Sequence, residues 1–170
     1  MSLEPQSRVE MLRQEVLARV GRNLLVYQSI ERSLKFLVPL SHPLGSVLGD
    51  DAYERLAVEL ASSTLGPLVA KFQEAFQTIR DPQDVSVYLR ALVRARNELV
   101  HDFLQRPVSL HDETGCMSTI AYLDDRFAEA INFQRLLEST NLEVSRALES
   151  QNQVTLSGNI DIVKVIRDRN

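Results

Sequence analysis

Apolar residues recur three and four positions apart over long stretches of this sequence, and residues that form turns are few. Between residues 7 and 38 the spacing is carried by Val26, Ile30, Leu34, Leu37 and Val38. Such spacing is typical of amphipathic helices, in which the buried face returns every turn. The chain has only six Gly and six Pro in 170 residues, which favours a few long elements over many short strands. The sequence therefore predicts an all-α fold, a helical bundle of about five helices.

The breaks in the apolar pattern divide the chain into five expected helices, at about residues 7–38, 51–63, 67–79, 82–105 and 117–150. Pro39 and the loop at 41–45 are expected to end the first helix, and Asp50 or Asp51 can cap the second. Asp81 can cap the fourth, with Pro82 in its first turn. Residues 1–150 are assigned to one helical domain, and residues 151–170 to a C-terminal segment that can be a strand, a helix or a tail.

Charge and composition exclude several classes of function. The formal net charge of −4 argues against non-specific binding to nucleic acid, so any contact with RNA must be local. Cys116 is the single cysteine, which rules out an internal disulfide and suits the cytoplasm. His42, His101 and His111 lack the spacing of metal ligands, so neither a metal nor a cofactor is expected. We also expect no membrane span and no signal peptide.

The fourth expected helix has a charged residue in the middle of its apolar face. On a helical wheel, Arg96 lies within about 60° of six apolar residues, namely Leu89, Leu92, Val93, Leu99, Val100 and Phe103. A guanidinium in a core is costly unless it is paired, and it cannot lose its proton. Glu31 also lies among apolar neighbours on the first helix. One interpretation is therefore structural: Glu31 and Arg96 form a buried ion pair, and His101 is a half-exposed bystander.

A narrow polar strip borders the same apolar face and consists of Arg90, Arg94, Asn97 and His101. Asn97 and His101 are four residues apart, so Asn97 can hydrogen-bond the imidazole and fix its orientation. An apolar stripe beside a polar strip is a suitable half of a two-fold interface. The sequence therefore also predicts dimerisation through the fourth helix.

The string Arg96-Asn97-Glu98-Leu99-Val100-His101-Asp102-Phe103 resembles the motif of the HEPN family (higher eukaryotes and prokaryotes nucleotide-binding). In that family an Arg, a polar residue, a short gap and a His lie on a late helix of a small helical domain. The matching residues are Arg96, Asn97 and His101. Residues 23–35 also resemble the family's opening helix, and by helix order the likeness covers about residues 7–150.

The resemblance implies a metal-independent endoribonuclease that works as a homodimer, with paired Arg and His residues lining one cleft between the subunits. In such an enzyme His101 would transfer a proton, Arg96 would hold the scissile phosphate, and Asn97 would orient His101 or touch the phosphate. Arg90 and Arg94 would bind neighbouring phosphates of the RNA, or form a solvated face. The implied setting is a toxin or phage-defence component with a cognate antitoxin or regulatory protein.

Phe103 departs from one branch of the family, which pairs with a nucleotidyltransferase antitoxin and has a modified Tyr at this place. Phe has no hydroxyl, so that modification is not expected here. Two other functions stay open: a non-enzymatic module that binds nucleotide, RNA or a protein, and a structural protein that dimerises through its long helices. The enzyme should expose Arg96 and His101 in one cleft, whereas the structural protein should seal Arg96 against Glu31.

Overall fold

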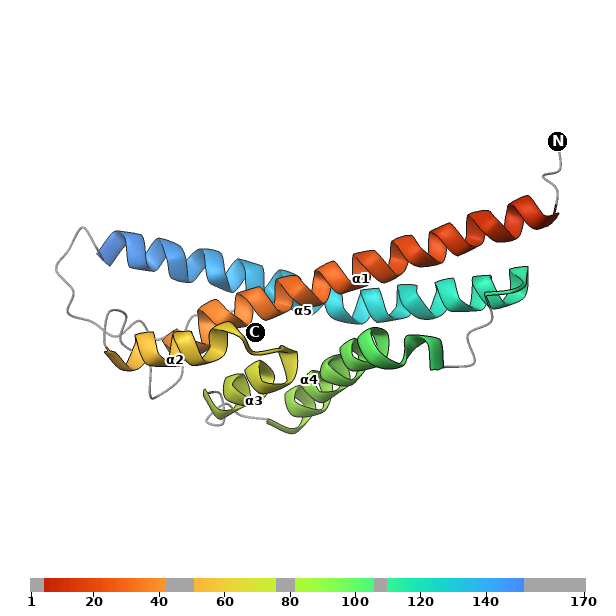
Figure 1. Cartoon of the computed structure of the whole chain (residues 1–170). Helices are drawn as coiled ribbons and strands as arrows, with labels where there is room; N and C mark the ends of the chain where they lie inside the picture. Colours follow the sequence, from red (N-terminus) through yellow and green to blue (C-terminus); the bar gives the residue numbers. More distant parts are fainter. Residues whose placement is uncertain (1–4, 42–50, 76–81, 106–109, 152–170) are drawn as a thin grey trace.

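The computed structural model describes residues 5–41, 51–75, 82–105 and 110–151, and every assigned element within these ranges is helical. The α-helices are α1 (Pro5–Ser41), α2 (Asp51–Ala61), α3 (Leu65–Ala75), α4 (Pro82–Asn97) and α5 (Glu113–Gln151) (Figure 1). Two short turns extend α4: a π-helical turn, η1 (Glu98–Asp102), and a 3-10 turn, η2 (Phe103–Gln105). The predicted all-α bundle of five helices is confirmed.

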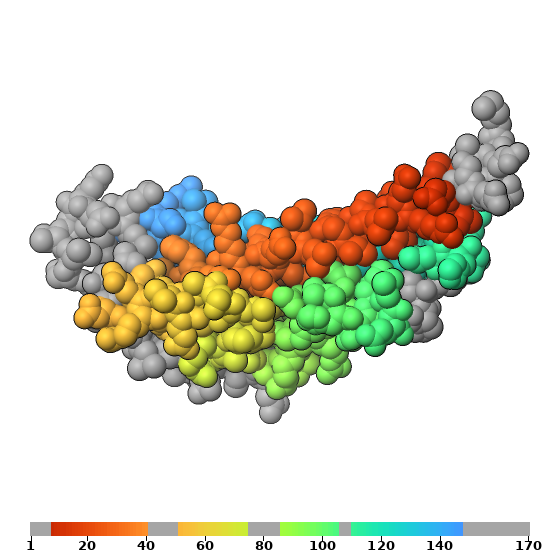
Figure 2. Space-filling view, in the orientation of Figure 1, coloured from red at the N-terminus to blue at the C-terminus, as the bar shows by residue number. Residues whose placement is uncertain are grey.

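Helices α1 and α5 form the long axis of the molecule and run in the same direction, while α2, α3 and α4 lie along one side of α1 (Figures 1 and 2). Polar contacts fix the register of the long pair. Buried Asn23 donates a hydrogen bond to the Leu123 carbonyl over 2.8 Å, and Arg22 contacts the Asp124 carboxylate at 2.7 Å. These bonds join segments about a hundred residues apart, so the central packing of the fold is non-local.

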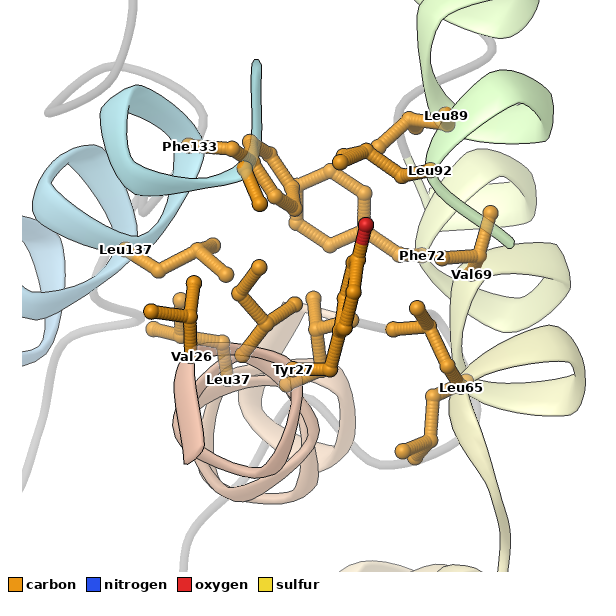
Figure 3. Packing of buried hydrophobic residues seen from close by; sticks show 14 of the residues in the cluster. Val26, Tyr27, Leu37, Leu65, Val69, Phe72, Leu89, Leu92, Phe133 and Leu137 are labelled. Atoms are coloured by element: carbon orange, nitrogen blue, oxygen red, sulfur yellow. The ribbon is translucent and has the colours of Figure 1, made fainter. Parts of the chain in front are cut away.

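The hydrophobic core lies where α1 meets the other helices (Figure 3). Ile30 and Leu34 of α1 are fully buried, as the helical spacing predicted. Two edge-to-face aromatic contacts close the core between α3, α4 and α5: the Phe133 ring lies 6.3 Å from Phe72 and 5.9 Å from Tyr88. Such pairs add to the free energy gained from area burial. The core therefore fixes α4, the helix that carries the candidate motif, against both long helices.

Three helix ends differ from the sequence-based expectation. Helix α1 continues through Pro39, which was expected to end it, because Pro39 and Leu40 are themselves buried. Helix α5 begins at Glu113, four residues early, because the Asp112 carboxylate accepts the N–H of Gly115 at 2.7 Å and caps the first turn. Helix α3 likewise begins at Leu65, before Pro67. Tertiary burial and side-chain caps outweighed the helix-breaking residues at these positions.

No described helix has both the length and the apolar character that crossing a bilayer requires. Several expectations lie outside the described residues: the loop at 42–45, the Asp81 cap and residues 152–170 of the C-terminal segment. Ser41, expected to begin that loop, is the last residue of α1. Asp51, one of the two cap candidates for the second helix, is instead its first helical residue.

Candidate functional site

The motif segment leaves regular α-helical geometry at the residue after Asn97. In the π-helical turn η1, backbone hydrogen bonds run from i to i+5 in place of i to i+4, which inserts an extra residue into the turn. A 100° wheel therefore fails beyond Asn97. Leu99 stays buried, but Val100, which was expected within the apolar stripe, is 43% exposed. π-Helical turns are rare and occur frequently at functional sites.

This turn also changes the relation between Arg96 and His101. In an α-helix, residues five positions apart point about 140° away from each other. The π turn takes more residues to complete a revolution, so it brings the two directions closer together. Ideal π-helical geometry thus narrows the angle between the two side chains, while the contacts of this structure direct Arg96 toward Glu31 and leave His101 exposed.

Arg96 and Glu31 form the ion pair that the structural interpretation of the sequence predicted, and this arrangement is the one expected of a structural protein, not of a nuclease with Arg96 open in a cleft. Arg96 Nη2 lies 3.4 Å from Glu31 Oε1, and each side chain is 16% exposed. Glu31 Oε1 also accepts a hydrogen bond from the backbone N–H of Leu65 over 3.0 Å, at the first residue of α3. The carboxylate thus satisfies a free N–H of a helix start while it neutralises the guanidinium.

Asn97 and His101 are both exposed, but they do not pair in the expected way. The Asn97 side-chain oxygen accepts a hydrogen bond from Arg96 Nη1 over 3.3 Å. Among the described contacts, no hydrogen bond joins Asn97 to the His101 imidazole, because the π turn displaces His101 from the i+4 position of a regular helix. His101 therefore presents its ring to solvent, and Asn97 braces Arg96 instead.

Arg94 and Arg90 are exposed on α4, about one and two helical turns before Asn97. The three apolar residues that lie opposite, Leu89, Leu92 and Leu99, are buried in the chain's own core. The apolar stripe expected to support dimerisation through the fourth helix is thus already occupied within one chain. The solvent-exposed side of α4 consists mainly of its polar strip.

A second set of side chains, on α5, lies beside the motif and was not identified from the sequence. Tyr122 of α5 donates a hydrogen bond from its hydroxyl to Glu98 Oε2 over 3.3 Å, and the Arg126 guanidinium lies 5.5 Å from the Tyr122 ring centre. The contact ties the first residue of the π turn to α5, and no local sequence pattern indicates it, because the partners are 24 residues apart.

Tyr27 brings an unusual polar atom into the core beneath the motif helix (Figure 3). Its side chain is 2% exposed, and its hydroxyl has no hydrogen-bond partner among the described residues. Burial raises the pKa of Tyr27 to about 12, against the opposing effect of nearby Arg126. The neighbouring Tyr88 is satisfied, because its hydroxyl donates to the Glu129 carbonyl over 2.6 Å.

The described residues contain no group of three or more His, Cys, Asp or Glu side chains arranged to hold a metal ion. The candidate site comprises the motif residues Arg96, Asn97 and His101, and Glu31 of α1 and Tyr122 of α5 contact this segment. No family model matches the chain, and neither a curated protein nor a solved structure matches it significantly.

Proposed function

We propose that this protein is a metal-independent endoribonuclease of the HEPN type, which works as a homodimer with Arg96 and His101 at its catalytic site. One observation carries the proposal. His101 is an exposed imidazole on a π-helical turn, five residues after a guanidinium that Glu31 and Asn97 hold in place. This combination supplies a proton-transfer group next to a fixed phosphate-binding group.

RNA carries its own nucleophile, the 2′-hydroxyl, so the protein needs to supply only proton transfer and charge stabilisation. His101 accepts the 2′-proton as the 2′-oxygen attacks the adjacent phosphorus. The bond from phosphorus to the 5′-oxygen breaks, and that oxygen takes up a proton from an imidazolium. The products are a 2′,3′-cyclic phosphate and a 5′-hydroxyl. Arg96 stabilises the negative charge that develops on the phosphoryl oxygens.

A second subunit completes this chemistry, because one imidazole cannot accept and donate a proton in the same step. Two copies supply two His101 side chains, one neutral and one protonated. Arg90 and Arg94 extend the positive strip toward neighbouring phosphates of the RNA. A toxin or phage-defence component in the cytoplasm, with a cognate antitoxin or regulatory protein, fits this activity.

The second candidate is a module of the same fold that binds nucleotide, RNA or a protein without cleaving it. The observation that favours it is the engagement of Arg96, which is only 16% exposed and already faces the Glu31 carboxylate. In that case Arg96 is a structural ion pair, and the exposed Arg90, Arg94 and His101 form a binding surface.

The test is incubation of purified protein with single-stranded RNA of mixed sequence in the presence of EDTA. The nuclease predicts fragments that end in a 2′,3′-cyclic phosphate, which end-group analysis identifies because the end resists ligation to a 5′-phosphate until the ring is opened and the phosphate is removed. Binding without cleavage, measured by fluorescence anisotropy of the same RNA, would support the binding module. Cleavage that requires an added divalent metal would contradict the proposed mechanism.

A further inference from the structure

The outer face of α1 carries a row of seven residues whose spacing is symmetric about the central residue, Gly21. The row, called here the α1 seam, consists of Glu10, Gln14, Leu17, Gly21, Leu25, Gln28 and Arg32. The intervals along it are four, three, four, four, three and four, so all seven lie on one face of the helix. Six are exposed and Gly21 is half-exposed, with Leu17 and Leu25 each 66% exposed.

Gly21, at the centre of the seam, has no explanation within the chain. A glycine in the middle of a helix weakens that helix, because it adds backbone freedom to the unfolded state. Close packing can justify the loss, yet a Cβ built on Gly21 would meet nothing within 4 Å. Packing within the described residues therefore does not account for a glycine at this position.

We propose that the α1 seam binds a second copy of this chain, antiparallel to the first, across a two-fold axis that passes through Gly21. Such an interface is isologous, so each residue faces the one at the same distance on the other side of the axis. Leu17 faces Leu25 of the partner subunit, and Gln14 faces Gln28 of the partner subunit. At each end, Glu10 faces Arg32 of the partner subunit. Each apolar residue thus faces an apolar residue, each amide faces an amide, and each charge faces the opposite charge.

The charges at the two ends are available for this contact. Glu10 has one recorded partner, the exposed Arg13 of its own helix, at 3.2 Å. Within the part of the chain that the structure describes, Arg32 has no ion-pair partner. Exposed ion pairs contribute little to affinity, but they fix register and direction. The parallel arrangement would instead place Glu10 against Glu10 and Arg32 against Arg32.

A hollow of about 520 Å³ borders the centre of the seam. Its lining is Ala18, Gly21, Arg22, Leu25, Val26 and Gln134. Arg22 does not fill it, since its guanidinium is bound to Asp124 and lies 3.9 Å from the Phe127 ring centre. In the antiparallel pairing, Leu25 of the partner subunit lies beside Ala18, where the small side chain leaves space.

Reversing the charges of Glu10 and Arg32, one at a time, tests the pairing. The measurement is analytical ultracentrifugation of the full chain at micromolar concentrations. The parent should sediment as a dimer. Glu10→Arg places Arg against Arg32, and Arg32→Glu places Glu against Glu10, so each variant alone should lose at least tenfold in dimer affinity. An equimolar mixture of the two variants should regain the dimer, because both ends are then oppositely charged. The matched control is Glu59→Arg on α2, whose exposed side chain lies outside the seam.

Cysteine substitutions test the register, and buried Cys116 does not compete. Gly21→Cys should give a disulfide-linked dimer on oxidation, because the axis brings the two positions together. Leu25→Cys alone should not, since its two copies stand eight residues apart along the helix, about 12 Å. Leu25→Cys mixed with Leu17→Cys should crosslink as a heterodimer. The exposed control is Val58→Cys on α2, and crosslinking there as efficient as at Gly21 would overturn the register.

The seam is argued from α1 alone and does not depend on RNA cleavage, and it is a different contact from the one that the nuclease needs. Glu31, which pairs with Arg96, lies ten residues from the axis at Gly21. Its two copies are therefore about 30 Å apart along the seam, and the two His101 side chains cannot share one site there. A monomeric parent, or a dimer that neither charge variant weakens, overturns the seam and leaves the cleavage assay unaffected. A seam dimer that cleaves no RNA supports the inference and counts against the nuclease.

Discussion

Glu31 of α1 lies 3.4 Å from Arg96 of α4, and the same carboxylate oxygen accepts the backbone N–H of Leu65 at the start of α3. A single side chain thus connects three helices at the edge of the core. The arrangement neutralises a charged residue in an apolar stripe and also fixes the guanidinium next to the π turn. The contribution of Glu31 to the stability of the protein is therefore linked to the position of the Arg96 guanidinium, and both can be measured.

Replacing Glu31 by Ala should destabilise the protein by about 3 kcal/mol, because it leaves the Arg96 charge unpaired in a mostly buried place. For a chain of this size, this corresponds to a fall in Tm of about 6–12 °C. Glu31→Gln should recover part of the loss, since an amide oxygen can still accept the Leu65 N–H. Circular dichroism melts provide the measurement, with exposed Glu59→Ala as control. A Glu31→Ala protein that melts like the parent would show that the ion pair contributes nothing.

Replacing His101 by Ala should lower the rate of RNA cleavage by about 10²–10⁴-fold, the usual contribution of a positioned proton-transfer group. The fold should be unaffected, since the side chain is exposed and truncation at the surface changes stability by less than about 0.5 kcal/mol. Single-turnover cleavage and a thermal melt give the two readouts. His111→Ala, another exposed histidine, should cleave like the parent. Undiminished cleavage by His101→Ala would point to a different site or a contaminating nuclease.

Neutralising Arg90 or Arg94 should weaken RNA binding most at low salt. Each phosphate contact to single-stranded RNA contributes about 0.7 to the slope of log K against log salt, so each Gln substitution should reduce that slope by about this amount. Fluorescence anisotropy titrations at salt concentrations from about 50 to about 200 mM measure this slope. Arg55→Gln on α2 is the matched exposed control. An unchanged slope in both variants would mean that the strip is an ordinary solvated face.

The same chemical change should have opposite effects at two tyrosines. Tyr27→Phe removes a buried hydroxyl that has no partner among the described residues, and should raise the free energy of unfolding by about 1 kcal/mol. Tyr88→Phe removes the hydrogen bond to the Glu129 carbonyl, and should lower that free energy by about 1 kcal/mol. Urea denaturation at neutral pH decides between the two signs. Equal effects would contradict the assigned hydrogen bonding.

Tyr27 also predicts how stability changes in alkali. Burial raises its pKa in the folded state to about 12, from 10.0. Between these values the unfolded chain has released the proton and the folded chain has kept it, so stability falls as the pH rises. The loss attributable to Tyr27 is about 2 kcal/mol between pH 10 and pH 12. Tyr27→Phe should lack this part of the loss, and urea titrations at pH 9 and pH 11.5 compare it with the parent.

The helical spacing of apolar residues was sufficient to predict the bundle, because it reports directly which faces are buried. Ile30, Leu34 and Leu89 are all fully buried as expected. The Glu31–Arg96 pair was predictable for the same reason, since two opposite charges interrupted two apolar faces. Helix ends were less predictable: Pro39 is accommodated because its neighbours are buried, and Asp112 caps α5 through its side chain.

The sequence names the residues of the candidate site, which stay a prediction, but not the local geometry of the segment that carries them. A wheel with a constant angle places Asn97 beside His101, and the π turn at Glu98–Asp102 removes that relation. Nothing in the local sequence marks this turn, which is held in part by Tyr122 on a different helix. The symmetry of the α1 seam is visible in the sequence, but its significance depends on exposure, and only the structure shows that Leu17 and Leu25 face outward.

The hydrogen bond from Asn23 to the Leu123 carbonyl spans a hundred residues, and this has a consequence during synthesis. Ribosomes add about 5–20 residues per second, so α1 emerges about 5–20 seconds before the part of α5 that covers it. During that interval Ile30 and Leu34 have no α5 to pack against, and α2, α3 and α4 cover only another side of the helix. A nascent chain stalled after α4 should therefore bind chaperones that recognise apolar segments, and release them once α5 has emerged.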